Sequence, residues 1–148
     1  IFMATVIIWF MQTFDTRLNV VENSADSILA ALGRLVSPIF APLGFGDWRM
    51  VTALVSGFTA KEAVVSTFGV ILGVSTEQLG IALHSLFTTA SAASFLAFCL
   101  LYTPCVAAVS TIKTELKSGW KTVGIVFAQC LVAWLAAFMV YHVGLLLT

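Results

Sequence analysis

The sequence predicts an all-α fold: a polytopic membrane helix bundle with about four membrane passages, at least one broken helix and one interfacial amphipathic helix. Of its 148 residues, 60% are hydrophobic and only 9% are charged, whereas a soluble domain averages about 25% charged residues. The mean hydropathy is +1.05. The apolar residues are gathered into long runs that short polar segments separate. This composition and this pattern indicate an integral membrane protein.

Several other classes of protein are disfavoured. The net charge is zero and there is no basic tail, so we expect no nucleic-acid partner. The motifs GxxxxGK[ST], HExxH and GxSxG do not occur, which leaves catalysis unsupported, and we expect no enzyme activity from this chain. Its cysteines lie in apolar stretches without CxxC spacing, which indicates neither a disulfide framework nor a structural zinc site: Cys99, Cys105 and Cys130.

The first two segments do not resemble complete spans. Residues 1–14 are apolar but fall short of the ~20 residues that a span needs, so we expect the end of a truncated helix. Residues 25–37 place apolar side chains at helical spacing on one face and Asp26 and Arg34 on the other. This segment is too short and too amphipathic to cross a bilayer, so we expect an interfacial helix that Pro38 ends.

Residues 49–73 form a membrane-length apolar run that Lys61 and Glu62 interrupt near its middle. As one helix the run is roughly 35 Å long. A charged residue at such a depth costs roughly 2.5–3.5 kcal/mol on an insertion scale, so both charges need partners inside the protein. Glu62 shares a helical face with Ser66, Gly69 and Gly73, against which another segment can pack closely. The alternatives to a functional role are a structural ion pair, or Lys61 bonded to loosened backbone carbonyls.

Residues 81–112 form an apolar run of about 48 Å as one helix, longer than an ordinary span. Pro104 is the candidate break, because a proline has no N–H for the carbonyl of Leu100. The pattern allows a discontinuous helix with a freed Leu100 oxygen beside Thr103 and Cys105, or an ordinary proline kink. His84 lies near the start of this run, so we expect its imidazole to face water rather than to bind a metal.

Residues 120–147 form the last membrane segment. With four passages, the loops at 15–49 and 111–121 share one side of the membrane. These loops hold six of the seven basic residues, the seventh being Lys61. The positive-inside rule therefore places both loops in the cytoplasm, although a re-entrant hairpin at either break would overturn this orientation.

The two interruptions at membrane depth, Lys61-Glu62 and Thr103-Pro104-Cys105, bring chemistry suited to a cation. A carboxylate, a thiol, hydroxyls and freed carbonyls can form a transient site. Thiolate favours softer metals and carboxylate favours harder ones, so a mixed site suits a borderline divalent ion such as Fe(II). Residue types alone indicate only some divalent metal, and Cys105 can equally be an inert small residue beside a kink.

Three stretches resemble the C-terminal membrane part of the bacterial ferrous-iron transporter family FeoB: GFTAKEAVVSTFGVILG (57–73), LLYTPCVAAVSTIKTE (100–115) and SILAALGRLVSPIFAPLGFGDWR (27–49). The resemblance covers nearly the whole chain, which would form a single gate-type domain over 1–148. It implies the second of two gate regions, half of an Fe(II) permeation path in the bacterial cytoplasmic membrane. Glu62 and Cys105 become candidate transient Fe(II) ligands, with Lys61, Ser66, Thr103 and Pro104 around them.

The resemblance also implies partners outside this chain. They are the first gate region, an N-terminal GTPase domain that would bind GTP and magnesium, and a small accessory protein. Related gate architectures occur in nucleoside-type transporters and spore-maturation membrane proteins, which remain alternatives. A further alternative is a non-transporting membrane scaffold in which the charged pair locks helices together.

Overall fold

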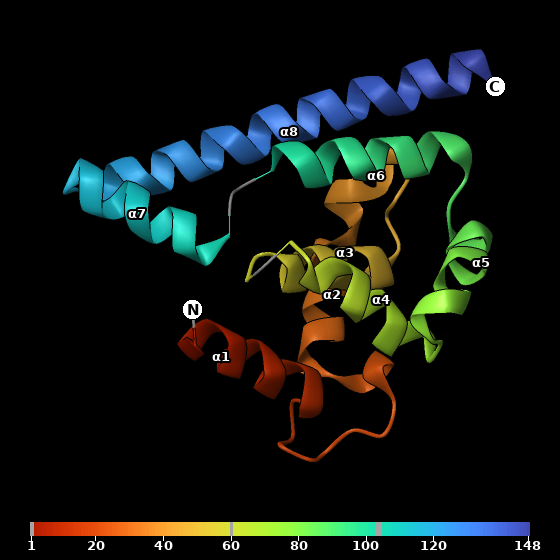
Figure 1. Cartoon of the computed structure of the whole chain (residues 1–148), viewed down its shortest axis with the longest axis horizontal. Helices are drawn as coiled ribbons and strands as arrows, with labels where there is room; N and C mark the ends of the chain where they lie inside the picture. The colour runs from red at the N-terminus through yellow and green to blue at the C-terminus, as the bar shows by residue number, and fades with distance from the viewer. Residues whose placement is uncertain (1, 60, 103–104) are drawn as a thin grey trace.

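The computed structural model describes residues 2–59, 61–102 and 105–148 (Figure 1). Regular structure in these residues is helical, apart from an isolated bridge between Phe14 and Val20. The α-helices are α1 (Phe2–Thr13), α2 (Ile28–Phe40), α3 (Trp48–Gly57), α4 (Ala63–Leu72), α5 (Thr76–Leu86), α6 (Thr89–Leu101), α7 (Val106–Leu116) and α8 (Gly119–Leu147), with 3₁₀ turns η1 (Ser24–Asp26) and η2 (Ala41–Leu43). The predicted all-α class is confirmed.

Figure 1 shows α6 and α8 side by side along one edge of the molecule, with α2, α3 and α4 gathered beneath α6. Helix α5 closes one end, between α4 and α6, and α7 packs against the first part of α8. Within the part of the chain that the structure describes, two stretches are long and apolar enough to cross a membrane: 89–116, which joins α6 and α7, and α8. The same residues give up to four spans if the bent pairs α2 with α3 (103°) and α4 with α5 (79°) each count as one.

Helix α2 differs from its prediction at both ends. It begins after Ser27, whose side chain accepts a hydrogen bond from the N–H of Ala30, and it continues past Pro38 to Phe40. A proline removes only its own N–H, so the following residues can still bond the preceding turn. Gly33 packs α2 tightly on α3, because a Cβ built there would lie 2.9 Å from the carbonyl oxygen of Trp48. The interfacial location of this helix stays a prediction.

The predicted membrane segment over 49–73 is interrupted and consists of α3 and α4. Asp47 caps α3 as its sequence suggests, accepting a hydrogen bond from the N–H of Arg49 (2.8 Å). Helix α3 ends at Gly57, and the carbonyl of Phe58 accepts a bond from the N–H of Val106 (3.0 Å) outside the helix. Open backbone is tolerated at membrane depth only where the protein supplies such partners. The break therefore coincides with the charged pair.

The run over 81–112 is broken twice, not once. Helix α5 begins at Thr76, upstream of the predicted run, and ends at Leu86. Helix α6 starts after Thr88, which forms a capping box with Ser91: each side chain accepts a hydrogen bond from the other residue's N–H. The capping role of these hydroxyls accounts for the extra break. Likewise α7 extends to Leu116, into the connection expected over 111–121.

Aromatic rings fill the core between α4, α6 and the turn after α2. Phe45 is 1% exposed and contacts Phe95 edge-on, with ring centroids 5.3 Å apart. Small side chains set the contact of α6 with α8. Ser94 is fully buried and donates its hydroxyl to the carbonyl of Ala137 (2.9 Å). Close approach through small residues and an interhelical hydrogen bond is the packing that membrane helices favour.

Candidate functional site

The breaks in the two interrupted helices meet in space. The first lies between Gly57 of α3 and Ala63 of α4, and the second lies between Leu101 of α6 and Val106 of α7. The backbone bond from Val106 to Phe58 joins them directly. The hydroxyl of Tyr102 adds a second link, donating to the carbonyl of Leu54 in α3 (3.3 Å). These two bonds join residues that are 48 apart in sequence. We call this junction the paired break (the described residues of 57–63 with those of 101–106).

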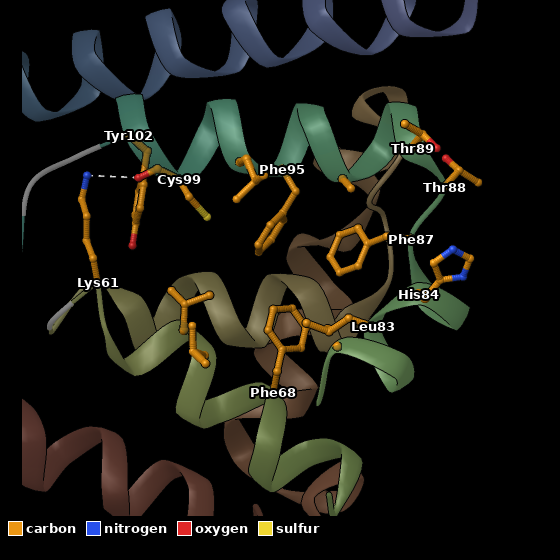
Figure 2. A pocket seen from close by; sticks show the side chains of 15 residues that line it. Lys61, Phe68, Leu83, His84, Phe87, Thr88, Thr89, Phe95, Cys99 and Tyr102 are labelled. Atoms are coloured by element: carbon orange, nitrogen blue, oxygen red, sulfur yellow. Dashed lines mark hydrogen bonds between the residues drawn. The ribbon is translucent and has the colours of Figure 1, made fainter. Parts of the chain in front are cut away.

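Lys61 ties the paired break to the end of α6. Its Nζ donates to the carbonyls of Cys99 (3.0 Å) and Leu100 (3.3 Å), as Figure 2 shows in part. It also lies 5.4 Å from the centre of the Tyr102 ring, within range of a cation–π contact. In an unbroken helix the Leu100 carbonyl would pair with residue 104, and a proline has no N–H to offer. The alternative in which Lys61 bonds loosened backbone carbonyls is therefore the one observed.

The predicted metal residues lie on the two sides of this junction. Glu62 is exposed at the N-cap position of α4 and makes no capping hydrogen bond there. Ser66 is exposed one turn further along α4, and Cys105 is half-buried at the N-cap of α7. The bond between Phe58 and Val106 brings their two segments together. Thr103 and Pro104, the other predicted pathway residues, lie outside the described residues.

The small-residue face that Glu62 was expected to share is not covered within this chain. Ser66 is exposed, and a Cβ added at Gly73 would meet nothing within 4 Å. Across residues 2–59, 61–102 and 105–148, no group of three or more His, Cys, Asp or Glu side chains is arranged to hold a metal ion. A complete ligand set at this junction therefore needs carbonyl oxygens, or groups from elsewhere.

A pocket of about 620 Å³ opens beside the paired break, between α4, α5 and α6 (Figure 2). Its middle is apolar and aromatic, with Phe68, Phe87 and Phe95 on its walls. Polar groups mark its two ends. Lys61, Cys99 and Tyr102 stand at one end, and His84, Thr88 and Thr89 stand at the other. The imidazole of His84 is exposed, which agrees with the water-facing reading.

Cys99 and Tyr102 are residues of the site that sequence reasoning missed. Cys99 looked like one more cysteine in an apolar run, and Tyr102 like one more aromatic residue in a membrane segment. The available signal was their distance from Pro104: Cys99 and Leu100 supply two of the carbonyls in the last turn of α6, and such carbonyls need a donor from outside the helix. Lys61 is that donor.

Comparison with known families gives one match over most of the chain. The Gate family, described as "Nucleoside recognition", matches residues 1–119. This chain belongs to the Gate family. No solved structure matches it.

Individual relatives of this Gate chain are named as iron transporters. It is 37% identical over 146 residues to the Fe(2+) transporter FeoB of Staphylococcus aureus strain COL, covering 97% of this chain and 22% of the relative. It is 32% identical over 149 residues to that of Methanocaldococcus jannaschii, covering 96% and 22%. A relative from Porphyromonas gingivalis is named a fusion of Fe(2+) transport protein A with FeoB. It is 34% identical over 142 residues, which cover 85% of this chain and 17% of the relative. The chain spans about a fifth of these relatives, and the predicted resemblance is confirmed.

Proposed function

We propose that this Gate domain forms half of the membrane path by which a longer protein carries Fe(II) across the bacterial cytoplasmic membrane. The observation that carries the proposal is the paired break, where two interrupted helices meet. Backbone carbonyls that accept hydrogen bonds from outside their own helices, a carboxylate and a thiol lie around this junction. Discontinuous helices of this kind form the ion sites of many transporters. The names of the relatives supply the ion, Fe(2+).

The donor set at the paired break suits a borderline divalent ion in transit. Glu62 offers carboxylate oxygens, Cys105 offers a thiol, and the end of α6 offers carbonyl oxygens. Hard oxygen and soft sulfur ligands together match Fe(II) better than Na⁺ or K⁺. Few protein ligands at any one point keep binding weak enough for the ion to leave, which conduction requires.

The other half of the path belongs to the rest of the protein. Glu62 and Ser66 lie on an exposed face of α4, which gives the first gate region a surface on which to complete the path. The GTPase domain of the longer protein, which would bind GTP and magnesium, would regulate transport from outside this chain. A small accessory protein is supported by the P. gingivalis relative, whose name joins Fe(2+) transport protein A to FeoB. The basic loops at 15–49 and 111–121 would face the cytoplasm.

A nucleoside gate is the second candidate, favoured by the description of the Gate family. The pocket beside the paired break has aromatic walls on which a base can stack, including Phe68, Phe87, Phe95 and Tyr102. Its described lining residues include no Asn or Gln side chain to pair with the base edge. Saturable binding of a radiolabelled nucleoside by the full-length protein, lost on Phe95→Ala, would favour this candidate over Fe(II).

Iron uptake by variants of the full-length protein tests the main proposal. Glu62→Ala and Cys105→Ser should each reduce ⁵⁵Fe(II) uptake, by roughly tenfold if each removes about 1.4 kcal/mol of stabilisation from the passing ion. Glu77→Ala, another exposed carboxylate outside the junction, and Cys130→Ser are the matched controls. All four variants should appear in the membrane at the level of the parent. Normal uptake by both Glu62→Ala and Cys105→Ser would remove these residues from the path.

A further inference from the structure

The end of α6 presents two carbonyl oxygens to one positive charge, and the charge comes from a side chain. Lys61 Nζ bonds the oxygens of Cys99 and Leu100 and lies over the Tyr102 ring. We propose that Lys61 is a tethered cation that closes a metal site made by these carbonyls and the Cys99 thiol, and that Fe(II) enters this site when Lys61 swings out. This inference rests on the proposed function and adds a site outside Glu62 and Cys105.

The carbonyls attract a cation for reasons independent of lysine. The last carbonyls of a helix have no intrahelical donor, and they carry the negative end of the helix dipole. Pro104 removes the N–H that would have served Leu100. Lys61 comes from the other broken helix, 38 and 39 residues away from the two carbonyls that it bonds. These oxygens therefore form a cation site, and an ammonium group occupies it.

The ammonium group can leave. Lys61 is exposed and lies in the turn before α4 rather than inside a helix. Its flexible stem runs along the mouth of the 620 Å³ pocket, which gives the group room to move (Figure 2). Cys99 lines the same end of the pocket. When Lys61 moves away, its two carbonyl acceptors lose this donor, and the Cys99 thiol, which points into the pocket, is the sulfur ligand that we assign to the site.

This vacated site matches the chemistry of Fe(II). Two hard oxygens and one soft sulfur suit a borderline divalent ion, and water can complete its shell from the pocket. Competition with a tethered ammonium lowers the apparent affinity for Fe(II): it equals the intrinsic affinity multiplied by the fraction of molecules in which the site is open. If that fraction is 10% or less, the apparent affinity without the ammonium is higher by about tenfold or more. Lys61 thereby sets the Fe(II) concentration at which this site fills.

The test is metal-dependent thermal stabilisation of the full-length protein under anaerobic conditions, titrated with Fe(II) alone. Lys61→Met should melt below the parent without metal, because two carbonyls lose their donor. Fe(II) should restore its melting temperature, with a midpoint about tenfold lower than in the parent. Lys61→Arg keeps the charge and Lys121→Met removes an exposed lysine elsewhere, so both should titrate like the parent. Equal midpoints in Lys61→Met and the parent would overturn the inference.

A measurement on the unmodified protein covers the case in which Lys61→Met fails to fold. Fe(II) should raise the rate at which an amine-reactive reagent acylates Lys61, because the ion displaces the ammonium group, while Lys121 reacts at an unchanged rate. An unchanged Lys61 rate would overturn the inference. The two proposals can fail separately. If the protein takes up Fe(II) but the acylation rate of Lys61 does not change, only the tethered cation is contradicted. If Fe(II) raises the acylation rate of Lys61 but is not taken up, only the transport function is contradicted.

Discussion

The side chain of Tyr102 contacts α3, α6 and Lys61 around the paired break. Its hydroxyl donates to the carbonyl of Leu54, its ring stacks on Phe98 (centroids 5.4 Å apart), and the same ring lies beneath Lys61. Only the first contact needs the oxygen atom, whereas the other two need the ring. The side chain is 7% exposed, so its loss would leave a cavity where the two broken helices meet.

Two substitutions of Tyr102 separate these contacts. Tyr102→Phe should cost about 0.5–1.5 kcal/mol, the worth of one hydrogen bond. Tyr102→Ala should cost about 3–5 kcal/mol, as for other large aromatic truncations in a core. The melting temperature of the full-length protein in detergent measures the difference. Equal losses for the two variants would show that the ring does not hold the junction together.

Gly33 controls the contact between α2 and α3. A Cβ at this position would lie 2.5 Å from Thr52 Oγ1 and 2.9 Å from the carbonyl oxygen of Trp48. The carbonyl belongs to the backbone of α3, so it cannot move aside as a flexible side chain can. The two helices are bent by 103° relative to one another, and the glycine lets them cross closely enough to bury Leu29 and Val51.

Gly33→Ala should therefore destabilise the protein by about 1–3 kcal/mol, the usual cost of overpacking. Gly80→Ala is a matched control in α5, since an added Cβ there meets nothing within 4 Å. By helix propensity alone this control should stabilise by up to about 1 kcal/mol. Thermal melting of both variants gives the comparison, and a Gly33→Ala protein as stable as the control would contradict the close crossing.

Composition was enough to predict the helical membrane class, but helix breaks were harder to locate. The break near Pro104 carried a clear signal, because proline lacks a donor. The break after Gly57 did not: the local sequence is apolar and continuous up to Lys61, and the helix opens because Val106, distant in sequence, supplies a donor. The break before Thr89 was missed because Thr88 and Ser91 suit both helix packing and capping.

The candidate site was predictable residue by residue but not as an arrangement. Lys61 and Glu62 stood out because charges at membrane depth are costly. That Lys61 would bond Cys99 and Leu100 depends on how the turn before α4 meets the end of α6, which no local pattern encodes. The exposed state of Glu62 likewise follows from the packing of α4, which no local pattern encodes.

The whole molecule divides into a lipid-facing edge and a junction. Helix α8 is apolar and largely uncovered, with Phe127 70% and Met139 66% exposed, as expected for side chains in contact with lipid. Beneath it, α6 is packed on one side against α8 and on the other against the core around Phe45 and Phe95. Glu62 at the N-cap of α4 and Ser66 within it are exposed, and the proposed function assigns this surface to contact with the other gate region.

Protection of Cys105 by iron tests most directly whether the paired break lies on the Fe(II) path. In a full-length protein whose other cysteines are replaced, Fe(II) should slow the alkylation of Cys105 by a small maleimide, because a bound ion occupies the thiol. Mg(II), which prefers oxygen ligands, should not protect the thiol, and Glu62→Ala should weaken the protection by Fe(II). Alkylation at the same rate with and without Fe(II) would contradict the central claim.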